Sequence, residues 1–194
     1  MNMTRPGQIE IRWHGRGGQG AVTSANLLAE AAYYAGFKGV TSAPTFGAER
    51  RGAPVTASTR LAEKPLRHFS QVENPDVIVV LDDSLLATAN AVKGLAENGF
   101  VIVNSHRTPQ ELGLADTFRA ATADADKIAK EINLCASGVI MVNTAMLGAI
   151  AKATGLITLE HINNVLVNAF SPKAAKKNIE AARLTYECTR CAFE

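Results

Sequence analysis

The chain has 194 residues, enough for one full-sized domain but short for two. Hydrophobic residues make up 47% and charged residues 20%, which excludes an intrinsically disordered chain. With 20 basic and 18 acidic residues, the formal net charge of +2 gives no reason to expect binding to nucleic acid or to a membrane. No apolar stretch reaches about 18 residues and no secretory signal is recognisable, so the expected location is the cytoplasm.

Short apolar runs and alternating patterns predict six strands, and amphipathic segments predict the helices between and after them. The predicted strands span residues 9–13, 37–41, 55–61, 76–82, 100–104 and 117–121. The predicted helices span residues 21–35, 84–98, 125–132, 143–154, 158–170 and 171–188, with Gly36 capping the first. Because strands alternate with helices, we expect one α/β domain over residues 1–194: a three-layer α/β/α sandwich around a mostly parallel or mixed, Rossmann-like sheet.

A glycine-rich loop lies between the first strand and the first helix. Its glycines match G-x-G-x-x-G, but no carboxylate stands near residues 41–42, where a dinucleotide site needs one about 20 residues on. No lysine follows Gly20, which excludes a P-loop. Two interpretations stay open: a turn that lets helix and strand pack closely, or a contact for phosphate or for a partner's backbone. At least one of these glycines should have a positive φ or a contact too close for a Cβ.

The sequence shows no catalytic constellation. No histidine has a carboxylate or cysteine partner at a recognisable spacing; the four are His14, His68, His106 and His161. Asp82 and Asp83 follow a buried strand, at the edge where open α/β sheets place ligands. The alternative is that Asp83 or Ser84 caps the following helix. We therefore predict no catalytic residue in this chain.

The three cysteines do not suffice for a metal centre. Cys188 and Cys191 form a C-x-x-C pair near the C-terminus, and Cys135 is isolated. An iron–sulfur cluster needs four thiolates, and a structural zinc site usually needs a second pair of ligands. We expect these thiols to bind no metal.

Four segments together resemble one family. Residues 10–23 read EIRWHGRGGQGAVT, residues 46–55 read FGAERRGAPV, residues 76–82 read DVIVVLD and residues 177–182 read KNIEAA. In this order they closely resemble the gamma subunit of pyruvate:ferredoxin oxidoreductase and related 2-oxoacid:ferredoxin oxidoreductases. The RRGAPV form is similar to the pyruvate and branched-chain (2-oxoisovalerate) branch. Residues 42–45 depart from the aromatic-rich sequence of that branch, so aryl and other 2-oxoacids stay open.

The resemblance implies one subunit of a larger enzyme. Such a complex oxidises a 2-oxoacid with CoA and ferredoxin, releasing an acyl-CoA and CO2, and uses thiamine diphosphate, Mg2+ and [4Fe-4S] clusters. The resemblance places thiamine diphosphate between alpha and beta subunits and the clusters mainly on a ferredoxin-like delta subunit. This chain would bind no cofactor alone and would act as a structural and gating domain. The alternatives are a stand-alone nucleotide- or CoA-binding module, or a 2-oxoglutarate- or indolepyruvate-type member of the same superfamily.

Two loops are the candidate contacts for CoA or for partner subunits. The glycine loop comprises Gly15, Arg16, Gly17, Gly18, Gln19 and Gly20. The docking and gating loop comprises Phe46, Gly47, Glu49, Arg50, Arg51 and Gly52. Arg50 and Arg51 suit phosphates or partner carboxylates, because guanidinium groups bind both bidentately. The alternative is that they form ordinary ion pairs within the chain.

Overall fold

A computed structural model of the chain describes residues 7–44, 50–66, 72–136 and 138–193. Strands β1 to β9 span, in order, Gln8–Arg16, Gly39–Pro44, Pro54–Ala62, Val77–Val80, Phe100–Asn104, Arg119–Ala123, Cys135–Ala136, Val139–Ile140 and Arg190–Cys191. Helices α1 to α6 span Ala21–Tyr34, Leu85–Thr88, Ala125–Glu131, Ala145–Thr154, Leu159–Ala169 and Pro172–Cys188. Strands and helices therefore alternate along the first part of the chain, as predicted, and helices dominate its end.

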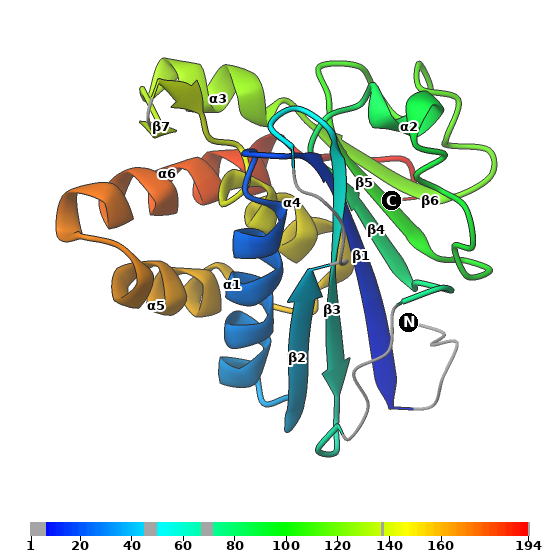
Figure 1. Ribbon diagram of the computed structural model, residues 1–194, viewed down its shortest axis with the longest axis horizontal. Helices are drawn as coiled ribbons and strands as arrows, with labels where there is room; N and C mark the ends of the chain where they lie inside the picture. The colour runs from blue at the N-terminus through cyan, green and yellow to red at the C-terminus, as the bar shows by residue number, and fades with distance from the viewer. Residues whose placement is uncertain (1–6, 45–49, 67–71, 137, 194) are drawn as a thin grey trace.

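Seven of the strands form one sheet, in the order β2-β3-β1-β4-β5-β6-β9. β1, β4, β5 and β6 are parallel neighbours, whereas β3 is antiparallel to both β1 and β2, and β9 is antiparallel to β6. The parallel strands end toward the top of Figure 1. The prediction of a mostly parallel or mixed sheet is confirmed, with the antiparallel strands at its two edges.

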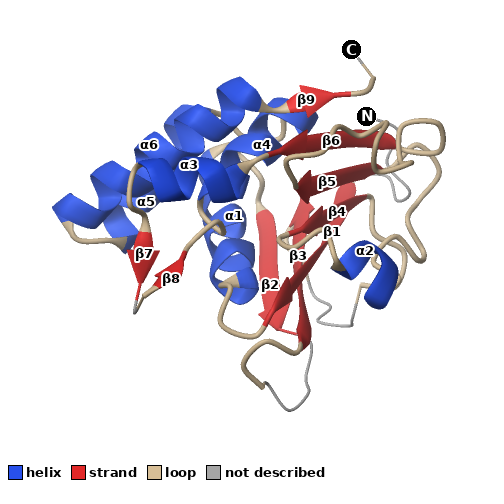
Figure 2. Ribbon diagram, turned by 90° about the horizontal axis from the view of Figure 1, so that it is seen from above, coloured by secondary structure: helices blue, strands red, loops and turns tan. Residues whose placement is uncertain are grey.

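Helices cover the two faces of this sheet very unequally. Figure 2 shows α1, α3, α4, α5 and α6 on one side and α2 on the other. The larger core packs α1 and α4 against the sheet, and the smaller core packs α2 and neighbouring loops against β4 and β5. The expected three layers are present, and one outer layer is thin.

β4 and β5 form the apolar centre of the fold. Val77 and Val79 of β4 point into the larger core, and Ile78 and Val80 point into the smaller core. All four are fully buried. A strand buried on both faces reads as a continuous apolar run, which is why residues 76–82 predicted it correctly.

The predicted helix over residues 84–98 is wrong beyond its first turn, because α2 ends at Thr88. The guanidinium of Arg12 takes hydrogen bonds to the carbonyl oxygens of Ala91 and Lys93, which a continuous helix would use internally. Gly94 has a φ of 78°, which also interrupts helical geometry. A residue distant in sequence thus overrides the local helical pattern.

β2 begins later than the predicted strand over residues 37–41, because the end of α1 includes Phe37. The Phe37 amide donates to the carbonyl of Ala32, and the Gly36 amide donates to Tyr33. With Gly36 at a φ of 100°, these bonds form a Schellman motif that terminates the helix. The strand therefore occupies Gly39–Pro44 and includes residues expected to lie in a loop.

The strand predicted over residues 117–121 is also displaced, to Arg119–Ala123. The amides of Thr117 and Phe118 both donate to Leu114, so a turn occupies these positions. The two-residue strands β7, β8 and β9 were not predicted, since two residues show no periodicity. The other helices begin and end within a residue or two of their predicted bounds. Among the described helices, none has the length and apolar character needed to cross a membrane.

Candidate functional site

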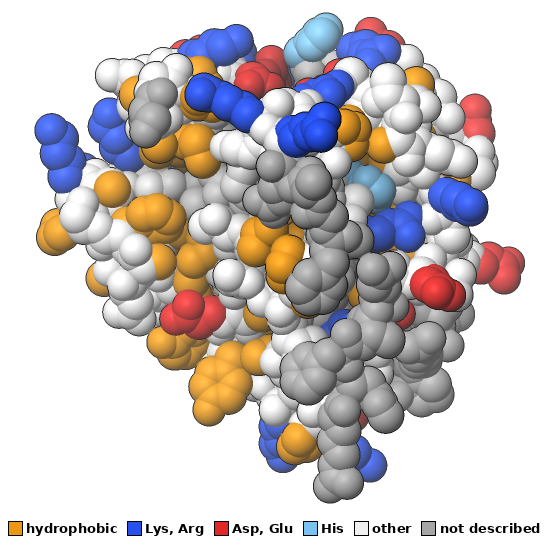
Figure 3. Space-filling view, viewed as in Figure 1, with side chains coloured by type: hydrophobic (Ala, Val, Ile, Leu, Met, Phe, Trp, Pro, Cys, Tyr) orange, Lys and Arg blue, Asp and Glu red, His pale blue; other side chains and the backbone are white. Residues whose placement is uncertain are grey.

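The candidate site lies where β1 and β4 end side by side. The chain leaves β1 into α1 on one face of the sheet and leaves β4 into α2 on the other face (Figure 2). Ligands of open α/β sheets bind at such switch points, outside the carboxyl ends of the strands. In Figure 3, Lys and Arg side chains gather along the top of the molecule, with acidic and histidine side chains among them.

The glycine loop forms a tight turn from β1 into α1. β1 extends through Arg16, so Gly15 lies in the strand and the turn itself comprises residues 17–20. Gly18 and Gly20 have φ values of 92° and 82°, and Gly20 is the N-cap residue of α1. The predicted strand-to-helix turn with positive φ is confirmed, although it is shorter than expected.

Gly17 joins the two predicted loops through backbone hydrogen bonds. Its amide donates to Ala53 at 2.8 Å, and its carbonyl accepts from the Gly52 amide at 3.0 Å. A Cβ on Gly17 would collide with the carbonyl oxygen of Arg50. The close approach between these two segments therefore requires glycine at this position, as the sequence predicted for at least one glycine of the loop.

Arg16 fastens this pair of loops to the end of β4. Its Nε lies 2.6 Å from Oδ2 of Asp82, its Nη2 donates to Ser84 Oγ at 2.7 Å, and its Nη1 donates to the Gly52 carbonyl at 3.1 Å. Burial alone would raise the pKa of Asp82, but hydrogen bonds from Ser84 and Arg16 outweigh it and lower the pKa. Arg16 thus points at the protein's own carboxylate.

Asp82, and neither Asp83 nor Ser84, makes the side-chain bond at the start of α2. Asp82 Oδ1 accepts from the Ser84 amide at 3.1 Å, and Ser84 makes no side-chain cap. Asp83 instead accepts from Ser105 Oγ at 2.7 Å and from Arg107 Nη2 at 3.0 Å. The predicted capping by Asp83 or Ser84 is therefore wrong, because both side chains turn toward other strand ends.

Arg50 and Arg51 lie beside this network and are exposed. Within the described ranges, neither side chain forms an ion pair or a hydrogen bond. Their backbone is fixed, because Ala53 donates to the Arg50 carbonyl at 3.0 Å and Gly17 brackets the turn. The alternative of ordinary ion pairs within the chain finds no support in the described residues. Phe46, Gly47 and Glu49 of the same predicted loop lie outside the described residues.

A groove of about 700 Å³ continues along the ends of β4, β5 and β6. Polar residues that directly follow these strands line it, namely Asp82, Asp83, Asn104, Ser105, Asp124 and Asp126. Their positions follow from the rule that parallel strands end at one edge, a signal available in the sequence that we used only for the aspartates after β4. The Asn104 amide donates to Asp126 at 2.7 Å and to the Leu81 carbonyl at 3.0 Å, so these groups largely satisfy one another.

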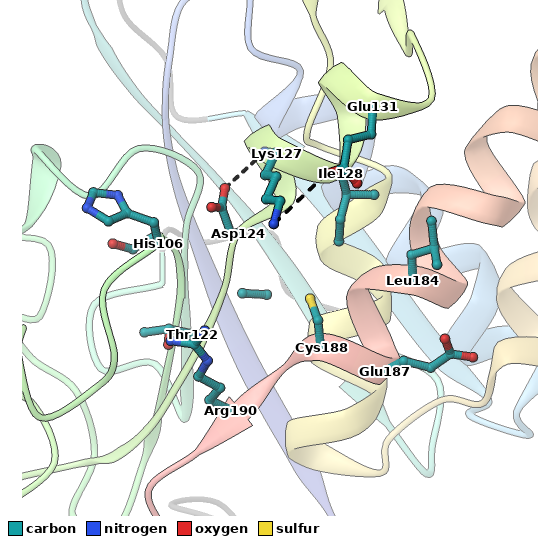
Figure 4. A pocket seen from close by; sticks show the side chains of 12 residues that line it. His106, Thr122, Asp124, Lys127, Ile128, Glu131, Leu184, Glu187, Cys188 and Arg190 are labelled. Atoms are coloured by element: carbon teal, nitrogen blue, oxygen red, sulfur yellow. Dashed lines mark hydrogen bonds and ion pairs between the residues drawn. The ribbon is translucent and has the colours of Figure 1, made fainter.

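An adjoining cavity of about 420 Å³ contains one of the thiols (Figure 4). Cys188 projects into it from the end of α6, facing Lys127 and Asp124 of the α3 segment. Burial raises the pKa of the Cys188 thiol, which favours the unreactive protonated form. Among the described residues, no three His, Cys, Asp or Glu side chains are grouped as metal ligands would be. The residues of this chain therefore do not fit an iron–sulfur cluster or a structural zinc ion.

The four histidines have separate environments. His161 completes a capping box with Thr158 at the start of α5, and His106 is exposed at the groove. His14 is buried and accepts a hydrogen bond from Arg12, while His68 lies outside the described residues. The structure brings no histidine of the described parts into a catalytic pair with a carboxylate or cysteine.

Known proteins share this sequence and fold along nearly their whole length. The model of the pyruvate ferredoxin/flavodoxin oxidoreductase family matches residues 10–188. The common gamma subunit of the pyruvate/ketoisovalerate oxidoreductases of Thermococcus litoralis is 50% identical over 184 residues, covering 93% of this chain and 97% of the relative. Pyruvate synthase subunit PorC of Methanocaldococcus jannaschii is 43% identical over 178 residues, covering 92% and 95%. The crystal structure of pyruvate oxidoreductase subunit PORC of Thermotoga maritima is 37% identical, with a TM-score of 0.79, and covers 95% of this chain and 98% of that one.

Fold and switch-point loops thus define a noncatalytic α/β subunit of an oxidoreductase complex. The chain belongs to the pyruvate ferredoxin/flavodoxin oxidoreductase family and is of its gamma type. The resemblance drawn from the four sequence segments is therefore confirmed.

Proposed function

We propose that this gamma-type chain serves an enzyme that converts pyruvate or a branched-chain 2-oxoacid, CoA and oxidised ferredoxin into acyl-CoA, CO2 and reduced ferredoxin. The names of the Thermococcus litoralis and Methanocaldococcus jannaschii relatives support this substrate class. In the assembled enzyme, thiamine diphosphate with Mg2+ and [4Fe-4S] clusters supply the decarboxylation and the electron path. We assign these groups to alpha, beta and ferredoxin-like delta subunits, because the described residues of this chain contain no matching ligand set.

The role proposed for this chain is to dock on the alpha subunit and to gate access beside the active site. The observation that carries the proposal is the exposed Arg50–Arg51 pair, which stands on a turn bonded to the glycine loop. A contact whose backbone is already ordered loses less conformational entropy on binding than a flexible one. Arginine also binds carboxylate and phosphate bidentately, which suits either a partner's acidic residues or the phosphates of CoA.

The test is a complex reconstituted with the Arg50→Ala plus Arg51→Ala chain. Assembly is measured by size-exclusion chromatography, and the dependence of the rate on CoA concentration is measured separately. We expect weaker assembly if the arginines meet a subunit, or a raised KM for CoA with intact assembly if they meet its phosphates. Raising the ionic strength should weaken either contact, since partly exposed charges are screened.

The matched control is Lys38→Ala plus Lys64→Ala. These lysines are also exposed, and they lie at the start of β2 and after the end of β3, away from the glycine loop. Both double variants remove two positive charges, so a general charge effect would appear in both. Unchanged assembly together with an unchanged CoA response in the arginine variant would contradict the docking and gating role.

The isolated chain is expected to have no oxidoreductase activity. The purified chain should contain no stoichiometric iron or sulfide and should bind no thiamine diphosphate, which metal analysis and calorimetry measure. Thiamine-dependent decarboxylation by the chain alone would contradict the assignment of catalysis to the partner subunits.

A further inference from the structure

A row of polar side chains follows β1 and β3 on the sheet face opposite α1. Cross-strand neighbours in this row are Glu10 with Arg60, Arg12 with Ser58, and His14 with Thr56. Ile11 and Trp13, which alternate with them on β1, point into the larger core. The polar row is nevertheless largely buried, with Glu10 3%, Arg60 4% and His14 6% exposed. Buried polar groups need partners, so each can be checked for its own.

Arginines along this face differ in how their charge is neutralised. Arg60 pairs with Glu10 at 2.7 Å, and Arg16 pairs with Asp82 at 2.6 Å. Arg12, between them, donates only to neutral acceptors: His14 Nε2 at 3.1 Å and the carbonyls of Glu73, Ala91 and Lys93. In the part of the chain that the structure describes, no carboxylate forms an ion pair with it. A half-buried guanidinium without a counter-ion favours binding of an anion.

His14 adds a hydrogen-bond donor next to this cation. Its Nε2 accepts from Arg12, so the neutral ring carries its proton on Nδ1. Burial, followed by the charge of Arg12, lowers the pKa of His14 to about 4, so the ring is neutral at pH 7. Among the described residues, Nδ1 has no acceptor. The ring therefore offers a directed N–H from a side chain that is 6% exposed.

Arg12 and His14 line the floor of a groove of about 580 Å³. Thr56 and Ser58 of β3 form one wall, and Asn74 and Lys93 belong to the opposite loops. This volume lies within the range of about 300–1,000 Å³ typical of small-molecule sites. The groove is separate from the glycine turn and from Arg50 and Arg51, none of which line it.

We propose that this groove is a binding site for a small carboxylate, of the size of a short-chain 2-oxoacid. A planar carboxylate can accept from His14 Nδ1–H through one oxygen and from the unused N–H of Arg12 Nη1 through the other. Its charge neutralises a guanidinium that the protein leaves without a counter-ion. A phosphate dianion suits the groove less, because its three oxygens need more donors than these two side chains supply.

The test follows the His14 ring by nitrogen-15 NMR of the full chain during titration. The probes are pyruvate, 2-oxoisovalerate, inorganic phosphate and methyl pyruvate, the last being the uncharged ester. We expect both carboxylates to shift the Nδ1 and Nε2 signals saturably, and phosphate and the ester to have little effect. No saturable shift at millimolar carboxylate, or an equal response to phosphate, would overturn the proposal.

Variants then separate the groove from general charge. His14→Leu removes the donor and should weaken pyruvate binding about tenfold, followed by the amide signals of Thr56 and Ser58. Arg107→Leu removes an exposed cation outside the groove and should leave pyruvate affinity unchanged. If Arg12→Met fails to fold because it releases three carbonyls, His14→Leu still decides the matter. Binding that occurs in the isolated chain but disappears in the assembled complex would show that a partner's carboxylate fills the groove, and would overturn the small-molecule assignment.

Discussion

The two halves of the sheet are both buried, but by different means. β4 and β5 are apolar on both faces, and every residue of either strand is buried. β1 and β3 are apolar only toward α1, and their other face buries charged and polar side chains. One half is stabilised by removal of apolar surface from water, whereas the other depends on pairing of charges and hydrogen bonds.

The candidate site lies at the junction of these halves. Arg16 ends the polar row of β1 and binds Asp82, the first residue after the apolar run of β4 and Leu81. The glycine turn and the arginine turn are anchored to that ion pair. The apolar half thus supplies a rigid strand end, and the polar half supplies the side chains that hold the loops.

The strongest test of the polar half is Arg60→Met. Arg60 and Glu10 have side chains that are 5% and 4% exposed, so the single change leaves a buried carboxylate without this cation. We expect the free energy of unfolding to fall by about 3–5 kcal/mol, measured by urea denaturation. The double variant Glu10→Leu plus Arg60→Met should recover a large part of the loss, because no lone charge remains. A double variant as unstable as the single one would show that the pair is not the source of the effect.

The apolar half can be tested on its two faces with Ile102→Ala and Ile78→Ala. Both side chains are fully buried, Ile102 in the larger core and Ile78 in the smaller. We expect losses of about 3–5 kcal/mol for Ile102→Ala and nearer 2 kcal/mol for Ile78→Ala, because coil on the thin side can close around a cavity more easily than packed helices. Equal losses in urea denaturation would mean that the thin layer is as rigid as the helical one.

His14 should make the polar half sensitive to mild acid. Its folded pKa of about 4 lies below the usual value of 6.5, so the unfolded chain binds more protons between these values. The stability contributed by the neutral ring is complete above about pH 6.5 and falls by about 3 kcal/mol as the pH drops to 4. Comparing wild type with His14→Leu across this range isolates the contribution. The lowered pKa of Asp82 has a separate window at still lower pH, because a carboxylate loses its contribution only as it becomes protonated.

The sequence predicted the apolar half and the glycine turn better than the polar half. Runs such as residues 76–82 have one compatible structure, and Gly17 and Gly20 mark a turn by their freedom from Cβ contacts. The role of Arg12 in ending α2 depends on contacts 79 and 81 residues away along the chain. The pairing of Gly17 with Gly52 likewise depends on the register of β1 against β3. Local periodicity contains no information about either contact.

The smallest expected change in stability, and the most informative for the junction, comes from Asp82→Asn. The carboxylate and its partner Arg16 have side chains 24% and 31% exposed, so the loss in unfolding free energy should be about 1 kcal/mol. The local effect should be larger. Arg16 also holds the Gly52 carbonyl, so hydrogen exchange at the Gly17 and Gly52 amides should accelerate.

Asp83→Asn is the control for this change, because Asp83 binds Ser105 and Arg107 and makes no contact with the glycine turn. It should leave exchange at Gly17 and Gly52 unchanged at a similar cost in global stability. If Asp82→Asn behaves like the control, the two loops are held by their backbone pairing alone. If it selectively loosens both turns and also weakens assembly of the reconstituted complex, the ion pair between the two halves of the sheet is what keeps Arg50 and Arg51 ready to bind.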